Sequence, residues 1–313
     1  MWKTKHENAA ASPGVQPPGA TLVPVSPMPA LAAVLKLDNI LVATDFSPAS
    51  KLATRFAVEI ARQHRAKLLM VHVAGSQSER PLMDAWRAGQ SEIMDHFIAG
   101  RLTGIDHELL VKPGDVWDVL SQLISERAID LVVVGTRGRT GMWKFFMGSV
   151  AERIFRLAPC PVLIVGPSSS QNPEAGPRRI LVPTGFAHQS LYAVRYAVWL
   201  AEQLRSALAV LHVVTEAGQL PAQEKERIRN ERLKRLRALI PESAALVCAA
   251  EFFVEFGAAT DQILSTCAVW NPNLMVLGLR PTGEVPPPEA AQTKAYDIIC
   301  KAPCPVMTVR EPA

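Results

Sequence analysis

DLVVVGTRGRTGMWKFFMGSVAERIFRLAPCPVLIV, residues 130–165, is the stretch that decides the fold of this chain. It opens with an apolar run of strand length at 130–135, continues through a glycine-rich loop and enters a helical pattern near Ser149. Pro159 and Pro161 end that helix because proline cannot continue helical hydrogen bonding. The apolar run at 161–165 is then a further strand. A strand, a helix and a second buried strand at this spacing predict parallel pairing.

The chain before this stretch alternates in the same way. Ser47 followed by Pro48 is typical of a helix N-cap and first helical position. We expect strands at 39–44, 67–73 and 107–111, helices from Ser47 and over 115–127, and an amphipathic segment around Trp86, Ile93 and Phe97. The prediction is a five-stranded parallel sheet with helices on both faces, which is a Rossmann-like α/β fold.

The whole pattern then repeats. RRILVPTGFAHQSLYAVRYAVWLAEQL, from residue 178, matches DNILVATDFSPASKLATRFAVEIARQH, from residue 38, and APCPVMTV at 302–309 matches APCPVLIV at 158–165. QNPEAGP, residues 171–177, has the composition of a linker. We therefore expect a flexible Pro/Ala-rich tail over 1–37, a first domain over 38–167, a linker over 168–177 and a second domain over 178–313.

Composition and charge argue against several classes of protein function. The formal net charge of +4 is spread along the chain, which does not indicate a nucleic-acid-binding protein. No run of 18 apolar residues and no signal-peptide pattern is present, so we expect a cytoplasmic protein with no membrane partner. The five cysteines show no C-x-x-C spacing, which argues against a disulfide framework or a zinc site.

The glycine-rich loop is the stretch that could carry chemistry. It leaves the carboxyl end of a buried strand, where open parallel sheets bind their ligands. Its glycines, Gly135, Gly138 and Gly148, permit close backbone approach to an anion. The helix that starts near Ser149 adds the positive end of its dipole.

These residues fit G-x2-G-x9-G-[ST], and with it the chain resembles the universal stress protein family, closely over about 37–166 and more loosely over 178–310. The resemblance implies an adenine nucleotide alpha hydrolase-like fold that binds ATP or another adenine nucleotide. Mg²⁺ is a candidate second ligand, bound through the phosphates. It implies these nucleotide-binding residues: Ala43, Thr44, Asp45, Val73, Val134, Gly135, Arg137, Gly138, Gly148, Ser149 and Val150.

The resemblance also implies a role for each group. Asp45 would accept a hydrogen bond from a ribose hydroxyl, and Val73 and Val134 would wall the base. Main-chain N–H groups around Gly148, Ser149 and Val150 would hold phosphate, with the Ser149 hydroxyl as an extra donor or a neighbour of Mg²⁺. The basic loop residues Arg137, Arg139 and Lys144 would add phosphate contacts or remain solvated.

Structural alternatives stand beside these roles. Asp45 could instead cap the first helix, and the glycines could serve a tight turn. His72 and His212 occupy equivalent strand positions among apolar residues, which favours packed histidines over catalytic ones. The aromatic loop residues Trp143, Phe145 and Phe146 could close over a nucleotide or face a partner subunit.

The second copy departs from the motif. Gly185 stands at the position of Asp45, and Pro281 and Gln292 stand where glycines are expected, although Gly278 is retained. Proline lacks an N–H donor, and Gln292 adds a Cβ where close backbone approach is needed. We expect the second domain to keep the fold and lose the site, which predicts one nucleotide per chain.

The leading functional hypothesis is an ATP-binding regulatory or stress-response protein with slow or no hydrolysis. A weak ATPase is one alternative, although the sequence lacks the GxxxxGK[ST] loop and the SGGxDS loop of ATP-using enzymes. A nucleotide-free interaction or dimerisation scaffold is another. We expect the domains to pair through their fifth strands, 161–165 and 305–309, as an intrachain pseudo-dimer, and a further homodimer is compatible with this.

Overall fold

The fold is described here from a computed structural model that covers residues 37–74, 102–136, 147–166, 169, 178–215, 220–245, 248–280 and 294–311. Several sequence predictions concern residues outside these ranges: the tail up to residue 36, the segment around Trp86, Ile93 and Phe97, the loop residues Arg137, Gly138, Arg139, Trp143, Lys144, Phe145 and Phe146, the linker 171–177, and Pro281 and Gln292.

The first repeat contains the predicted strands and helices, with ends that differ by one or two residues. They are β1 (Asn39–Ala43), α2 (Pro48–His64), β2 (Lys67–Ala74), β3 (His107–Pro113), α5 (Val116–Glu126), β4 (Leu131–Gly135), α6 (Ser149–Leu157) and β5 (Val162–Val165). Ser47 caps α2, because its side chain accepts a hydrogen bond from the Ser50 N–H, and Pro48 follows as predicted.

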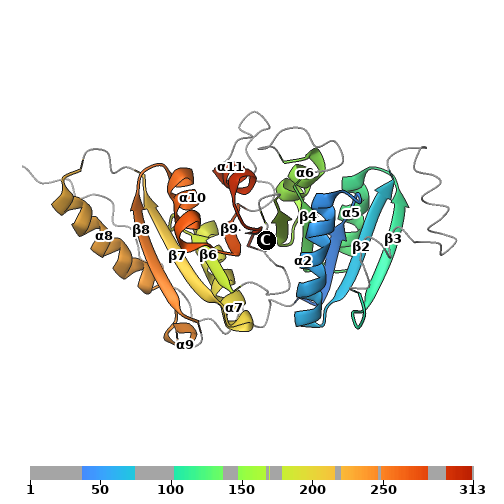
Figure 1. Cartoon of the computed structure of the whole chain (residues 1–313), viewed down its shortest axis with the longest axis horizontal. Coiled ribbons are helices and arrows are strands. Elements are labelled where there is room, and N and C mark those ends of the chain that lie inside the picture. The colour runs from blue at the N-terminus through green and yellow to red at the C-terminus, as the bar shows by residue number, and fades with distance from the viewer. Residues whose placement is uncertain are drawn as a thin grey trace, which may run out of the picture.

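The second repeat has the same order of elements, with additions before β8. It comprises β6 (Arg179–Pro183), α7 (His188–Leu204), β7 (Ala207–Val214), α8 (Ala222–Arg237), α9 (Glu242–Ala245), β8 (Ala250–Phe256), α10 (Ala259–Trp270), β9 (Leu274–Gly278), α11 (Lys294–Lys301) and β10 (Val306–Val309). The duplication read from the sequence is therefore a duplication of structure (Figure 1).

The ten strands in the described part of the chain form one sheet in the order β3-β2-β1-β4-β5-β10-β9-β6-β7-β8. Every pairing within a repeat is parallel. The repeats join through β5 and β10, which pair antiparallel with Leu163 opposite Met307. The predicted pseudo-dimer through the fifth strands is thus confirmed. This pairing covers two sheet edges whose backbone groups would otherwise lack partners.

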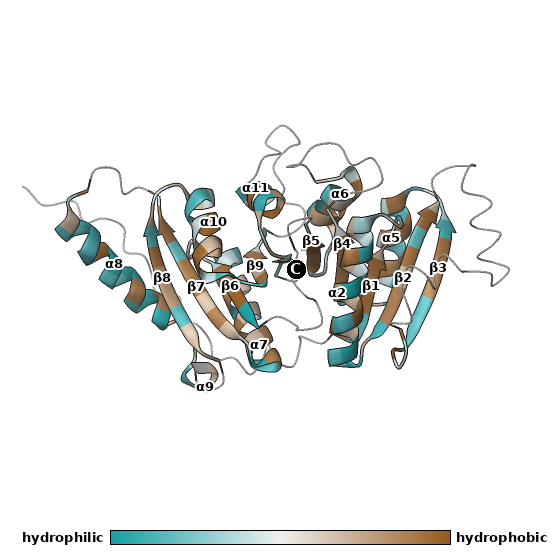
Figure 2. Ribbon diagram, viewed as in Figure 1, coloured by the Kyte–Doolittle hydropathy of each residue, from teal (hydrophilic) through white to brown (hydrophobic). Residues whose placement is uncertain are grey.

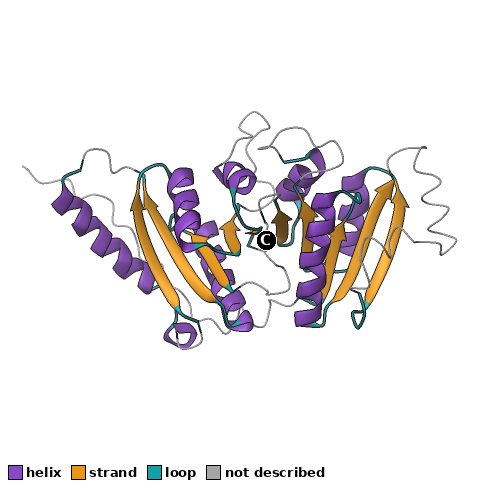
Figure 3. Ribbon diagram, in the orientation of Figure 1, coloured by secondary structure: helices purple, strands orange, loops and turns teal. Residues whose placement is uncertain are grey.

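Helices cover both faces of the sheet, as predicted (Figure 3). Side chains alternate along a strand, so each strand feeds two cores. One core lies on the face of α2 and α7, and the other lies on the face of α5, α6, α10 and α11. Both cores run through the junction, with Leu163 and Met307 in the first and Ile164 and Val306 in the second. The apolar strands and the more polar outer surfaces of the helices are visible in Figure 2.

Leu37, the last residue of the expected tail, is described and lies in the core on the α2 face. Its side chain is 5% exposed. Residue 37 therefore packs with the first repeat.

Candidate functional site

A cavity lies where β1 and β4 run side by side at the centre of the first repeat. The chain leaves β1 through α2 on one face and leaves β4 through α6 on the other, so this is the topological switch point of the sheet. The cavity volume is about 170 Å³, whereas a single water needs about 10–15 Å³. The space is therefore suited to a small molecule.

The structure brings together all the predicted site residues that it describes. Ala43, Thr44, Asp45, Val73, Val134, Gly135, Gly148, Ser149 and Val150 line the cavity. Arg137 and Gly138 lie outside the described residues.

Five further lining residues were missed by the sequence reasoning: Ser50, Val71, Val116, Thr136 and Ala151. Val71 could have been found, because it lies two residues before Val73 and so shares its face of β2. Val116 belongs to α5, and only the packing of α5 beside α6 brings it to the site.

The turn after β1 holds Asp45 at one end of the cavity. Thr44 Oγ1 accepts a hydrogen bond from the Phe46 N–H at 3.1 Å, and Asp45 Oδ1 accepts one from the Ser47 N–H at 3.0 Å. Phe46 has a left-handed backbone with φ of 63°. Asp45 thus stabilises the turn that leads into α2, which agrees with the structural alternative. Asp45 also lines the cavity.

The carboxyl group of Asp45 is tuned toward its charged form. Burial opposes ionisation and is the largest single influence, but hydrogen bonds from Ser47 and Ser50 together outweigh it. The pKa of Asp45 therefore lies below its ordinary value. At neutral pH this end of the cavity presents a carboxylate, which accepts hydrogen bonds from hydroxyl groups and disfavours anions.

His72 is a packed residue, as the sequence predicted. Its Nδ1 lies 2.8 Å from the Thr44 carbonyl oxygen, and its ring lies 4.7 Å from that of Phe46. His212 has the same contacts with Thr184 and Phe186. Burial is the main cause that lowers the pKa of His212, so its ring is neutral at pH 7. Both histidines support the turn that follows the first strand of their repeat.

Helix α6 forms the opposite end of the cavity. The N–H groups of Ser149, Val150 and Ala151 lie in its first turn, where no intrahelical acceptor exists, and the positive end of the helix dipole lies there. Gly148 differs from the prediction, because its N–H donates to the Thr136 carbonyl at 2.7 Å. The donors that this end can offer an anion therefore begin at Ser149.

Thr136 adds a second polar feature to this end. Its side chain is 4% exposed, and its hydroxyl has no hydrogen-bond partner among the described residues. A buried hydroxyl without a partner is costly unless a ligand or water satisfies it. Its position in the cavity lining makes it a candidate ligand contact.

Gly135 is required by packing. A Cβ at this position would lie 2.8 Å from the carbonyl carbon and oxygen of Ala49 in α2, and these are backbone atoms that cannot move aside. Gly278 has the same relation to the backbone of Gln189 and Ser190 in the second repeat. Packing alone therefore requires a glycine at position 135 and also explains why Gly278 is retained, while the role of Gly135 in phosphate approach stays a prediction.

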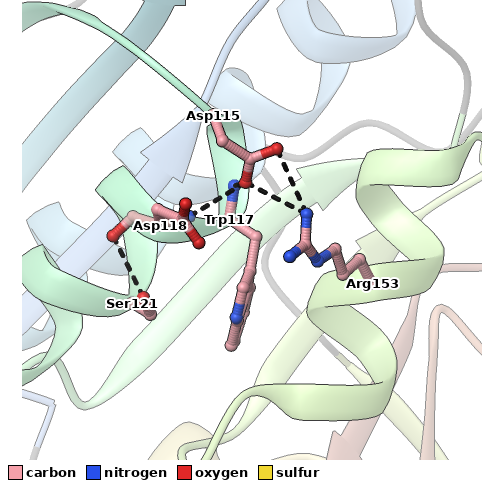
Figure 4. Close-up of polar contacts among 5 residues, drawn as sticks. All are labelled: Asp115, Trp117, Asp118, Ser121 and Arg153. Atoms are coloured by element: carbon pink, nitrogen blue, oxygen red, sulfur yellow. Dashed lines mark hydrogen bonds and ion pairs between the residues drawn. The ribbon is translucent and has the colours of Figure 1, made fainter.

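An ion pair links the N-terminus of α5 to α6 (Figure 4). Asp115 caps α5 by accepting hydrogen bonds from the N–H groups of Trp117 and Asp118, and its carboxylate lies 3.0 Å from Arg153 Nη1 of α6. The hydrogen bond from Asp118 is the main cause that lowers the pKa of Asp115. Both side chains are about half exposed, so the pair contributes little to stability.

The second repeat keeps the scaffold of this site without its carboxylate. Thr184 Oγ1 accepts a hydrogen bond from the Phe186 N–H, and Phe186 has a φ of 61°, as in the first repeat. Gly185 replaces Asp45. The part of the prediction that concerns Pro281 and Gln292 lies outside the described residues.

The described residues contain neither a metal-binding cluster nor a membrane-spanning helix. No three His, Cys, Asp or Glu side chains among them gather in a way that could hold a metal ion. Within the same residues, no helix is long and apolar enough to cross a membrane.

Comparisons with known proteins identify relatives of both repeats. The model of the universal stress protein family matches residues 36–166 and again 176–310. A Staphylococcus haemolyticus protein named as a universal stress protein is 32% identical over 142 residues, which are 42% of this chain and 86% of that protein. One from Staphylococcus aureus strain USA300 is 33% identical over 143 residues, with the same shares.

Two solved structures share the complete tandem fold. A universal stress protein from Archaeoglobus fulgidus has a TM-score of 0.64 at 18% identity and covers 88% of this chain and 98% of its own. A protein of unknown function from Pseudomonas aeruginosa PAO1 has a TM-score of 0.62 at 16% identity, with 90% and 95% covered. With its family model matched once in each repeat, the chain belongs to the universal stress protein family.

Proposed function

We propose that the first repeat binds one adenine nucleotide, ATP or another adenylate, and that the chain is a nucleotide-binding regulator of the stress response. The observation that carries this proposal is the polarity of the cavity. A carboxylate, Asp45, stands at one end and a helix start with free N–H donors, α6, stands at the other. Valine side chains from β2, β4 and α5 lie between them.

Each part of a nucleotide has a matching part of this cavity. Asp45 would accept a hydrogen bond from a ribose hydroxyl, and Val71, Val73 and Val134 would contact the base. The N–H groups of Ser149 and Val150 would receive phosphate oxygens. The Thr136 hydroxyl, which has no partner among the described residues, would donate to the same phosphate group.

A magnesium ion would enter with the phosphates, because the described residues offer no cluster of acidic ligands for it. The Ser149 hydroxyl, which lines the cavity, would neighbour such an ion. Bound Mg²⁺ would neutralise phosphate charge. Arg137 and Gly138 remain proposed contacts from the loop. We expect turnover far below the usual enzyme range of about 1–1000 per second, because the sequence contains no motif that would activate water.

The test is to identify and count what the purified protein holds. Mass spectrometry of small molecules released from the full chain should find an adenine nucleotide, and titration should give one site per chain. Asp45→Ala should weaken binding, because the ribose loses its acceptor. Asp106→Ala is a matched control, since Asp106 is an exposed carboxylate just before β3, at the amino ends of the strands. Absence of any adenylate binding in titration would refute the proposal and favour the nucleotide-free scaffold.

A further inference from the structure

The second repeat contacts helix α6 of the first repeat at both of its ends. At the amino end, the hydroxyl of Tyr296 in α11 accepts a hydrogen bond from the Met147 N–H at 3.3 Å, just before the N-cap Gly148. At the carboxyl end, the guanidinium of Arg310 donates to the carbonyl oxygens of Phe155, Arg156 and Ala158 at 2.7, 3.1 and 3.3 Å.

The contact of Arg310 at the carboxyl end matches the needs of a helix terminus. The last carbonyls of a helix have no intrahelical donors, and a cation is favoured at that end of the dipole. Arg310 is buried, and its Nε donates to the Arg280 carbonyl at 3.1 Å. Burial lowers the pKa of Arg310 to about 10, which leaves the group charged at neutral pH. Three of the four carbonyl acceptors lie at the end of α6, so the buried charge of Arg310 holds that end in place.

Among the described residues, no matching contact runs from the first repeat to α11. The matched sequences APCPV align Arg310 with Gly166 and Tyr296 with Glu152. Gly166 has no side chain to reach α11, and Glu152 pairs with Arg156 of its own helix at 2.8 Å. The joining of β5 and β10 is nearly symmetric, so it does not by itself account for contacts made by the second repeat alone.

We propose that the second repeat positions the binding site of the first, with Tyr296 and Arg310 as the positioning residues that hold α6 against the cavity. This inference rests on the proposed function, because it assigns these residues an effect on phosphate binding. Neither residue lines the cavity. They act through α6, whose first N–H groups would face the phosphate. By linkage, a bound nucleotide must stabilise the two contacts to the same extent.

The first experiment compares Tyr296→Phe and Arg310→Lys with the wild type in the full chain, using titration with ATP and with adenosine. Each change removes hydrogen bonds while it keeps most of the packing, so ATP affinity should fall by about two- to tenfold. Adenosine affinity should not change, because adenosine has no phosphate to meet α6. Tyr192→Phe is the matched control, since Tyr192 is a buried tyrosine of α7 in the core on the opposite face.

The second experiment needs no ligand. Hydrogen exchange of the amides of residues 147–152 should be faster in Tyr296→Phe than in the wild type, and unchanged in Tyr192→Phe. Equal ATP affinity in all variants, or an equal loss of ATP and adenosine affinity, would overturn the inference. If the wild type binds no nucleotide, the proposed function fails, and the exchange rates alone then decide whether Tyr296 holds α6.

Discussion

The two repeats differ most where a ligand would bind and least where the chain packs on itself. Thr44, Phe46 and His72 have counterparts in Thr184, Phe186 and His212, with the same hydrogen bonds and ring contacts. Asp45 has no such counterpart, because Gly185 stands in its place. Each repeat can therefore serve as a reference for the other. Features present in both repeats maintain the fold, and features present only in the first are candidates for binding.

This comparison corrects the interpretation of the glycine motif. Gly135 and Gly278 occupy matching positions, and both are forced by close contact with the backbone of the helix after the first strand. The first glycine of the motif is therefore required by packing whether or not a ligand binds. The discriminating positions are Asp45 and the start of α6.

The largest expected effect is loss of binding in Gly148→Val. A β-branched side chain would stand beside the N–H groups that receive phosphate, and the backbone at Gly148, with φ of −62° and ψ of 152°, is accessible to valine without strain. Binding at a hundredfold excess over Kd should stabilise the wild type by about 2.7 kcal/mol, and calorimetry should find no such shift in the variant.

Gly283→Val is the control for that change, because it lies in the second repeat's divergent stretch. It should leave the calorimetric shift intact. Two equivalent sites per chain, or a shift that survives Gly148→Val, would contradict the assignment of one site to the first repeat.

Gly278→Ala should cost the fold about 1–3 kcal/mol or more. The new Cβ would lie within 2.6 Å of the Gln189 carbonyl carbon, which belongs to the helix backbone. Gly185→Ala is the matched control in the same repeat, because its Cβ would meet nothing within 4 Å. Urea denaturation of both variants measures the difference. Equal stability of the two would show that packing does not explain the retained glycine.

The charge of Asp45 should give the first repeat a specific acid sensitivity. Because its folded-state pKa is lowered, the stabilisation from its carboxylate is present above the unfolded-state pKa of about 3.9 and is lost as pH falls through the folded value. Asp45→Asn should therefore flatten the fall in stability below about pH 4. Thermal unfolding between pH 2.5 and pH 7, with an Asp106→Asn control, would detect this, and identical slopes would contradict it.

The smallest expected effect concerns the starts of α2 and α7. Ser47 caps α2 through the Ser50 N–H at 3.2 Å, whereas Ala187 gives α7 no side-chain cap. Ser47→Ala should destabilise the chain by about 1 kcal/mol, and Ala187→Ser should stabilise it by about 0.5–1 kcal/mol. Denaturation curves of the two variants should move in opposite directions. If both denaturation curves move in the same direction, the two helix starts differ more than their backbone conformations indicate.

Local patterns in the sequence determined where the strands lie, where α2 begins and which edge strands pair. Apolar runs located the strands, Ser47-Pro48 located the start of α2, and the repeated APCPV segments identified the edge strands that pair. The carboxyl ends of β1 and β4 could be assigned to one site because parallel strands bring them to the same edge. These features depend on residues near one another in the chain, or on a topology that spacing alone restricts.

Tertiary structure alone decided the rest. The Gly148 N–H is occupied by the Thr136 carbonyl, Gly135 is fixed by the Ala49 backbone, and Arg310 reaches α6 across 155 residues of sequence. Hydrogen bonds and steric contacts between distant segments leave no periodicity in a sequence, since each depends on the position of a backbone that other packing has set. The sequence could therefore predict a site in the first repeat, and only the packed structure could reveal that the second repeat forms hydrogen bonds at both ends of α6, a helix that lines the cavity.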